Sequence, residues 1–278
     1  MSPGAKFRSA LQTERPLQVV GAINAYAALL AERAGFHALY VSGAGVANHS
    51  RGIPDIGQTT LEDVATDVRR IAHRTPLPVL VDIDTGWDDP GASVRALAAA
   101  GAAAVHIEDQ VPAKLCGHLP GKHLVTSADM VARVKSAVAG KPDPSFVIMA
   151  RTDAAAVEGV SAAIRRAQEY VAAGADMIFA EALRSLDDFR SFATAVQAPV
   201  LANLTEFGQT PPFTLNELSA AGIALVLYPL SASRAAAAAS LDVYRTIRRD
   251  GSASAALEKM QTRTELYDVL GYTPPKEK

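Results

Sequence analysis

The sequence predicts an α/β fold, a (β/α)8 TIM barrel, and three observations support this prediction. Eight short, almost unbroken apolar segments recur along the chain, as is typical of strands buried on both faces of a parallel sheet. Alanine-rich segments with helical spacing separate them, and no linker divides the 278 residues. We therefore expect one barrel domain over residues 1–278, with a C-terminal helical extension at about 253–272. A doubly wound open sheet is the alternative that the same pattern allows.

The expected strands follow the apolar segments in chain order. They are Val19–Ile23, Ala38–Val41, Pro78–Asp84, Ala103–Glu108, Phe146–Arg151, Met177–Glu181, Val200–Leu204 and Leu225–Tyr228. The segments Gly159–Ala173 and Ser231–Arg249 have helical spacing and are examples of the helices expected between and after the strands.

A repeated phrase marks where helices end and strands begin. An Ala-Gly pair precedes an apolar segment at Ala34-Gly35, Ala100-Gly101, Ala173-Gly174 and Ala221-Gly222. Glycine just past a helix end adopts the left-handed cap conformation at low cost. Four copies predict one such helix end in every second βα unit.

Composition excludes several function classes. The chain is 49 % hydrophobic and 20 % charged with a formal net charge of −2, so no basic excess suggests nucleic-acid binding. No uncharged apolar run reaches the roughly 18 residues that span a bilayer, and the start lacks an apolar signal core. One cysteine cannot form an internal disulfide. We expect a cytoplasmic protein without membrane or nucleic-acid partners.

Polar residues end nearly every expected strand. In an α/β barrel the active site lies at the carboxyl ends of the strands. Those ends are Ser42-Gly43-Ala44-Gly45, Asp82-Ile83-Asp84, Glu108-Asp109, Arg151-Thr152-Asp153, Glu181, Asn203-Leu204-Thr205-Glu206 and Tyr228. One such residue could cap the next helix, but seven together predict an active site.

Asp82 and Asp84 are the candidate metal ligands. Two apart on a strand, they would point to the same face and repel unless a cation lay between them. Oxygen ligands without histidine or cysteine favour Mg²⁺ over zinc. Glu108 could hold a metal-bound water. The alternative is one capping aspartate and one solvated aspartate.

Arg151 is the candidate carboxylate-binding group. It follows the apolar segment Phe146–Ala150, and a guanidinium in a confined site favours bidentate recognition of a carboxylate. The alternative is an internal ion pair with Asp153 or Glu181. His106, inside an apolar strand, is more typical of a core histidine than of a catalytic one.

Cys116 is the candidate acid or nucleophile. It is the only cysteine, and Lys114 and His118 beside it could stabilise a thiolate. Gly117 leaves room for a substrate. The alternative is a buried cysteine that acts as a small hydrophobe.

With these residues placed, the chain resembles the isocitrate lyase and phosphoenolpyruvate mutase superfamily over Val19 to about Tyr272. The matching phrases are Tyr40-Val-Ser-Gly-Ala-Gly-Val-Ala, Val81-Asp-Ile-Asp, His106-Ile-Glu-Asp-Gln, Lys114-Leu-Cys-Gly-His, Ile148-Met-Ala-Arg-Thr-Asp-Ala, Asn203-Leu-Thr-Glu-Phe-Gly, Leu227-Tyr-Pro-Leu-Ser-Ala and Met260-Gln-Thr-Arg. The Cys-Gly-His phrase is characteristic of the lyase members. The last phrases favour the members that cleave 2-methylisocitrate.

The resemblance implies a barrel whose last helix is exchanged between subunits of a homotetramer. It implies a Mg²⁺ site at Asp82 and Asp84, with Glu108 and Asp55 nearby. The residues that match the family's substrate pocket, with its covering loop at 116–118, are Ser42, Gly43, Ala44, Asp55, Gly117, His118, Arg151, Glu181, Asn203, Leu204, Thr205, Arg234 and Arg263.

The implied activity is Mg²⁺-dependent cleavage of a small tricarboxylate, 2-methylisocitrate, to pyruvate and succinate, as in the methylcitrate cycle of propionate catabolism. Cys116 would protonate the succinate carbon, and Tyr40 or Glu181 would be the base. Leu115 and Leu119 stand where the family usually carries basic residues, so isocitrate and 2,3-dimethylmalate stay alternative substrates. Oxaloacetate decarboxylation and dicarboxylate binding without turnover are the remaining alternatives.

Overall fold

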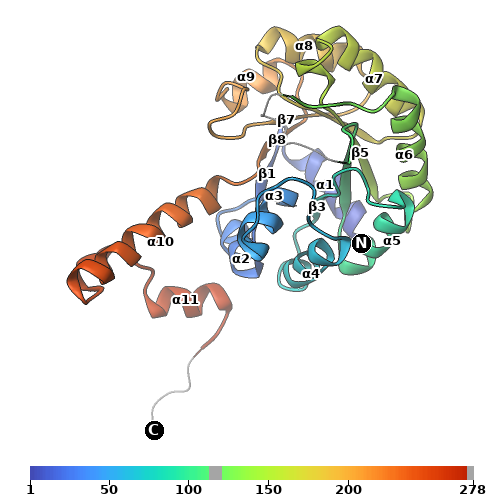
Figure 1. Ribbon diagram of the computed structural model, residues 1–278. Coiled ribbons are helices and arrows are strands. Elements are labelled where there is room, and N and C mark those ends of the chain that lie inside the picture. The colour runs from blue at the N-terminus through green and yellow to red at the C-terminus, as the bar shows by residue number, and fades with distance from the viewer. Residues whose placement is uncertain (113–120, 274–278) are drawn as a thin grey trace.

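The computed structural model describes residues 1–112 and 121–273 and contains a closed barrel of eight parallel strands (Figure 1). The strands are β1 (Leu17–Gly21), β2 (Ala38–Val41), β3 (Val79–Asp82), β4 (Ala104–Glu108), β5 (Val147–Thr152), β6 (Met177–Ala180), β7 (Val200–Asn203) and β8 (Leu225–Tyr228). Each strand pairs with the next, and β1 pairs in parallel with β8. This last pairing closes the sheet, so the barrel prediction is confirmed and the open sheet is excluded.

All eight predicted strands exist. Those at Ala38–Val41 and Leu225–Tyr228 have the predicted bounds, and the other six differ by one or two residues at one or both ends. The first strand begins at Leu17, two residues before its predicted start. The third ends at Asp82, before its predicted end, because Asp84 has a left-handed backbone with φ +49° that no strand can contain.

Helices surround the barrel and alternate with its strands (Figure 1). They are α1 (Pro3–Thr13), α2 (Ala25–Arg33), α3 (Gly43–Gly45), the π-helix η1 (Val46–Arg51), α4 (Leu61–Ala72), α5 (Pro90–Ala100), α6 (Ser127–Ala139), the 3₁₀ helix η2 (Ala154–Ala156), α7 (Val160–Ala172), α8 (Leu186–Ala195), α9 (Leu215–Ala220), α10 (Ser231–Asp250), the 3₁₀ helix η3 (Ser254–Lys259) and α11 (Arg263–Leu270). None of these helices is both long enough and apolar enough to cross a membrane.

The four Ala-Gly pairs lie at helix ends, as predicted. Gly35, Gly101, Gly174 and Gly222 follow α2, α5, α7 and α9, and their φ angles are +89°, +107°, +105° and +83°. A residue with a Cβ would be strained in this conformation, so glycine ends the helix there and lets the next strand begin.

The interior of the barrel is apolar toward its amino end. Phe7 of α1 is fully buried and belongs to one cluster with Leu17, Val147 and Leu225, which lie near the starts of their strands. Helix α1 thus covers the amino end, and the opposite end is left for a site.

Helix α10 carries the chain away from the barrel (Figure 1). Of its twenty residues only Ser233 and Thr246 are buried, while Leu241, Tyr244 and Ile247 are exposed. The segment after it contains η3 and α11. Helix α11 packs beside α2, where Tyr26 donates to Gln261 and Arg33 pairs with Asp268.

Candidate active site

The polar residues that end the strands meet at the carboxyl end of the barrel. Asp82 ends β3, Glu108 ends β4, Arg151 lies in β5, Glu181 follows β6 and Asn203 ends β7. All five side chains are buried. Because parallel strands place their carboxyl ends at one mouth, residues as far apart in the sequence as Asp82 and Asn203 come within reach of one another.

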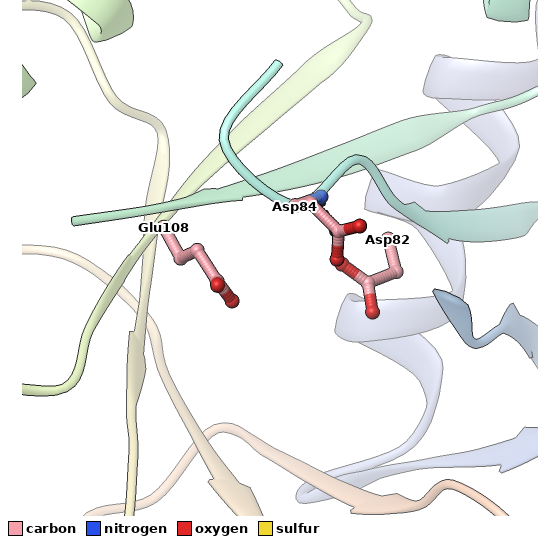
Figure 2. A group of neighbouring side chains, drawn as sticks. All are labelled: Asp82, Asp84 and Glu108. Atoms are coloured by element: carbon pink, nitrogen blue, oxygen red, sulfur yellow. Dashed lines mark hydrogen bonds between the residues drawn. The ribbon is translucent and has the colours of Figure 1, made fainter. Parts of the chain in front are cut away.

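Three buried carboxylates form a cluster at this mouth. Asp82, Asp84 and Glu108 each place a carboxylate oxygen within 4.8 Å of the others (Figure 2). Asp84 is not in the strand, contrary to the prediction. Its left-handed backbone turns the chain back, and its N–H donates to Asp82 Oδ1 at 3.1 Å. The turn therefore brings the two aspartates together.

Gly43 lets the backbone approach this cluster closely. Its N–H donates to Asp82 Oδ2 at 3.0 Å. A Cβ at this position would lie 3.0 Å from Asp82 Oδ2 and 3.3 Å from Asp84 Oδ1. The Ser42-Gly43 turn thus helps to hold Asp82, and a residue with a Cβ at position 43 would crowd both aspartates.

The cluster fits a divalent cation. Three buried carboxylates this close repel one another unless a cation or protons lie between them. All the donors are oxygen atoms, the ligands that Mg²⁺, Mn²⁺ and Ca²⁺ prefer. The alternative of a capping aspartate is wrong, because Asp89 is the N-cap of α5.

Tyr40 and His106 lie beside the carboxylates. The Tyr40 hydroxyl lies 2.8 Å from His106 Nε2 and 3.4 Å from Asp82 Oδ2. Burial raises the pKa of Tyr40 well above its usual value, and Asp82 raises it further. His106 is a core histidine, as expected, but it also borders the site. Its position two residues before Glu108 on one strand was the available signal.

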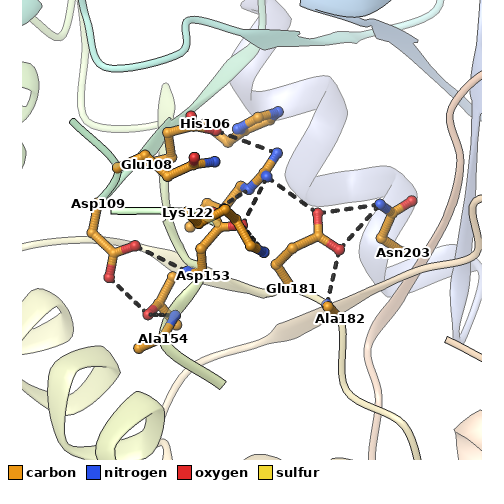
Figure 3. Close-up of polar contacts among 12 residues, drawn as sticks. His106, Glu108, Asp109, Lys122, Asp153, Ala154, Glu181, Ala182 and Asn203 are labelled. Carbon is orange, nitrogen blue, oxygen red and sulfur yellow. Dashed lines mark hydrogen bonds and ion pairs between the residues drawn. The ribbon is translucent and has the colours of Figure 1, made fainter. Parts of the chain in front are cut away.

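Arg151 lies among three carboxylates, those of Glu108, Asp153 and Glu181, which Figure 3 labels. Its Nε and Nη2 donate to Asp153 at 3.0 and 3.1 Å, and it lies 3.3 Å from Glu108 and 3.4 Å from Glu181. Burial disfavours its charge, but these carboxylates raise the pKa of Arg151 well above its usual value. The internal ion pair foreseen as an alternative therefore exists, within a confined polar site.

Glu181 and Asn203 form the next part of the mouth. Asn203 Nδ2 lies 3.4 Å from Glu181 Oε2, and Ala182 N–H donates to Glu181 Oε1 at 2.8 Å (Figure 3). Thr205 donates to Asn203 Oδ1 at 3.1 Å. Leu204 and Thr205 also line a cavity of about 660 Å³. A bound molecule could therefore extend beyond the carboxylate cluster on this side.

The two predicted arginines near the C-terminus lie apart. Arg234 is half-exposed at the start of α10, 3.8 Å from Glu206 and 5.7 Å from the centre of the exposed Phe207 ring. Glu206 and Phe207 line the same cavity. Arg263 begins α11, outside the barrel, and is exposed. Its role in substrate binding stays a prediction.

The remaining predicted residues are placed as follows. Ser42 is buried and precedes α3, and Ala44 is half-buried. Asp55 is half-buried in the loop between η1 and α4 and is not one of the three clustered carboxylates. Cys116, Gly117 and His118 lie outside the described residues, as do Lys114, Leu115 and Leu119.

Sequence reasoning missed a buried network behind Arg151. Lys122 Nζ donates to Asp153 at 2.8 Å, and Asp153 N–H donates to Asp109 at 2.9 Å. Tyr170 also donates to Asp109, and burial raises the pKa of Asp109. These partners lie 31 to 61 residues apart, so no local pattern could have paired them.

Comparisons with known proteins agree with this geometry. The family model described as phosphoenolpyruvate phosphomutase matches residues 7–248. A 2-methylisocitrate lyase of Salmonella typhimurium is 54 % identical over all of this chain and 95 % of its own, and one of Shewanella oneidensis is 55 % identical over 98 % and 94 %. A solved 2,3-dimethylmalate lyase of the PEP mutase/isocitrate lyase superfamily matches with a TM-score of 0.90 and 33 % identity over 98 % of this chain and 92 % of that one. The chain therefore belongs to the phosphoenolpyruvate phosphomutase family, within the PEP mutase/isocitrate lyase superfamily.

Proposed function

We propose that this protein is a metal-dependent carbon–carbon lyase that cleaves 2-methylisocitrate to pyruvate and succinate. The observation that carries the proposal is the three-carboxylate cluster beside buried Arg151, at one mouth of the barrel. This arrangement suits an anionic substrate that is held partly by a cation and partly by a guanidinium. The full-length relatives named 2-methylisocitrate lyase support the choice of substrate.

Asp82, Asp84 and Glu108 would hold the cation, which we assign as Mg²⁺. When bound, it would supply Lewis-acid polarisation of the substrate's α-hydroxy-carboxylate group. Glu108 would act either as a ligand or through a metal-bound water. Gly43 N–H holds Asp82 in place and belongs to the segment that would receive a substrate carboxylate.

The reaction is a retro-aldol cleavage of the Claisen type. The base takes the substrate hydroxyl proton, and that oxygen becomes the carbonyl oxygen of pyruvate as the adjacent C–C bond breaks. The bonding electrons pass to the succinate fragment as an enediolate, and a proton then adds to its carbon. Arg151 stabilises negative charge on the substrate carboxylates during this step.

Tyr40 and Glu181 are the two candidates for the base. Tyr40 lies beside the carboxylate cluster and His106, whereas Glu181 lies beside Arg151 and Asn203. Cys116 is the proposed acid, on the basis of the sequence, because a thiol with an ordinary pKa of about 8.5 can donate a proton near neutral pH.

Assembly as a homotetramer with an exchanged helix is part of the proposal. Helix α10 exposes Leu241, Tyr244 and Ile247, which lie three residues apart on one face. A second copy of the chain would cover this apolar face. A cytoplasmic location, which one cysteine in 278 residues favours, belongs to the same proposal.

The test is a comparison of substrates under one set of conditions. We expect 2-methylisocitrate to be cleaved with the highest kcat/KM of a set that includes isocitrate, 2,3-dimethylmalate and oxaloacetate. A methyl group contributes about 1–3 kcal/mol to discrimination, so slow cleavage of the first two is expected. EDTA should abolish activity and Mg²⁺ restore it. Preferred turnover of oxaloacetate would contradict the proposal.

One solved relative favours a second candidate substrate. The structure named 2,3-dimethylmalate lyase matches nearly the whole chain with a TM-score of 0.90. Its lower identity of 33 %, against 54 % for the relative from Salmonella typhimurium, places this candidate second. The same comparison of substrates decides between them.

A further inference from the structure

Lys122 forms a buried ion pair directly behind Arg151. Its side chain is 2 % exposed, and its Nζ donates to Asp153 Oδ1 at 2.8 Å. Asp153, labelled beside Lys122 in Figure 3, is fully buried just after β5. Its carboxylate also accepts two hydrogen bonds from Arg151. Taking two charges out of water is costly, so a buried pair is weak evidence of added stability and calls for another explanation.

The carboxylate of Asp153 is shared between two cations. Arg151 Nη2 and Lys122 Nζ both donate to its Oδ1, and Arg151 Nε donates to its Oδ2. Burial alone would raise the pKa of Asp153, but Arg151 and Lys122 together hold it below its usual range. The three side chains therefore carry one net positive charge between them.

This sharing matters because Arg151 has other carboxylate neighbours. It lies 3.3 Å from Glu108 and 3.4 Å from Glu181. A substrate carboxylate must compete with these groups for the guanidinium. Without Lys122, the full charge of Asp153 would act on Arg151 as well, and the local field would repel an anion.

We propose that Lys122 is a positioning residue that acts on Arg151 through Asp153. Asp153 orients the guanidinium by two hydrogen bonds, and Lys122 offsets the charge of Asp153 so that Arg151 attracts a substrate carboxylate. The inference rests on the proposed function insofar as Arg151 binds a carboxylate of the substrate. The new element is that the pair of Lys122 and Asp153, without contacting the substrate, sets the affinity of the site for anions.

The chain offers a matched control at the opposite end of the barrel. Lys141 Nζ pairs with Asp176 at 2.6 Å, and Arg8 pairs with the same carboxylate at 2.7 Å. Asp176 directly precedes β6, so this trio lies at the amino end, away from the mouth. Lysine, arginine and aspartate thus form a second trio of the same residue types, far from the site.

The experiment compares Lys122→Met, Asp153→Asn, their double variant and the control Lys141→Met. For each we would measure kcat and KM for 2-methylisocitrate, and the Kd of oxalate with saturating Mg²⁺ by calorimetry. Lys122→Met should raise KM and the oxalate Kd about 10- to 100-fold, the range typical for loss of an outer-shell partner, with a smaller change in kcat. Lys141→Met should leave both within about twofold, as expected for an independent distant site.

The double variant tests whether Lys122 acts through Asp153. Once Asp153 is neutral, adding Lys122→Met should change KM and the oxalate Kd by no more than about twofold relative to Asp153→Asn, since the charge to be offset is gone. A larger loss in this background would overturn the proposal. So would a Lys122→Met variant that binds both ligands like the wild type.

Two further outcomes can be distinguished from a failure of the proposed role of Lys122. If Lys122→Met does not fold because Asp153 loses one of its two cationic partners, the comparison between Asp153→Asn and the double variant still decides, since neither carries the charge of Asp153. If the wild type does not cleave 2-methylisocitrate, the proposed function fails, and the oxalate affinities of the same variants test the role of Lys122 separately.

Discussion

Replacing Gly43 by alanine tests how closely the backbone supports the carboxylate cluster. The added Cβ would lie 3.0 Å from Asp82 Oδ2 and 3.3 Å from Asp84 Oδ1, where ordinary contacts begin at 3.4 Å. The nearer oxygen must therefore move by about 0.4 Å, twice the tolerance of about 0.2 Å that metal–ligand distances allow. We expect Mg²⁺ affinity to fall about 10- to 100-fold, or about 1.4–2.8 kcal/mol.

Gly45→Ala is the control, since it makes the same substitution two residues further along α3. Its Cβ would meet only ordinary contacts, the nearest at 3.4 Å from Ser42 Cβ. Alanine favours helices over glycine by up to about 1 kcal/mol, so neither variant should lose Tm through helix propensity. The assay is Mn²⁺ binding without substrate, together with Mg²⁺ activation of cleavage. Equal metal affinities for the two variants would refute the reasoning.

Four other predictions concern the acid, the base, stability and assembly. Cys116→Ser should lower kcat by at least the ~10²–10⁴-fold typical of a general acid, without a change in Tm, and near-normal cleavage would contradict its role. Tyr40→Phe and Glu181→Gln identify the base. The variant that removes the base should lower kcat by a similar factor and abolish the rise of the rate with increasing pH, while the other variant should lower kcat less. Hydrogen bonds at the N-cap of α4 hold the pKa of Asp63 below its usual range. Asp63 therefore stabilises the fold above about pH 4, by up to about 1 kcal/mol, so the Tm gap to Asp63→Asn should close as the pH falls further. Tyr244→Glu should shift the molar mass measured by light scattering toward smaller species, and an unchanged mass would count against assembly through α10.

The barrel could be predicted from sequence because its signals are local. Each buried strand is a short apolar run, and each of the four Ala-Gly pairs ends a helix with a left-handed glycine. The mouth could be predicted for the same reason, since every parallel strand ends there. Predicting that Asp82, Glu108 and Arg151 lie at the mouth required only the position of each strand end.

Other features depend on contacts between distant segments. The left-handed turn at Asp84 and the pairing of Lys122 with Asp153 follow from packing around the mouth, which no single segment encodes. The role of His106 was difficult to predict for a different reason. A histidine within a buried strand gives the same sequence pattern whether it fills the core or borders the site. The direction of α10 also depends on distant contacts, because the helical spacing of its residues does not indicate what covers the helix.

The most direct test of the central claim is product formation from 2-methylisocitrate, followed by NMR, for the wild type and Asp84→Asn. The cluster of Asp82, Asp84 and Glu108 beside Arg151 should make cleavage depend on all three carboxylates. The wild type should form pyruvate and succinate in equal amounts with Mg²⁺, and Asp84→Asn should form neither at a comparable rate. Absence of both products with the wild type, or undiminished cleavage by Asp84→Asn, would contradict the account.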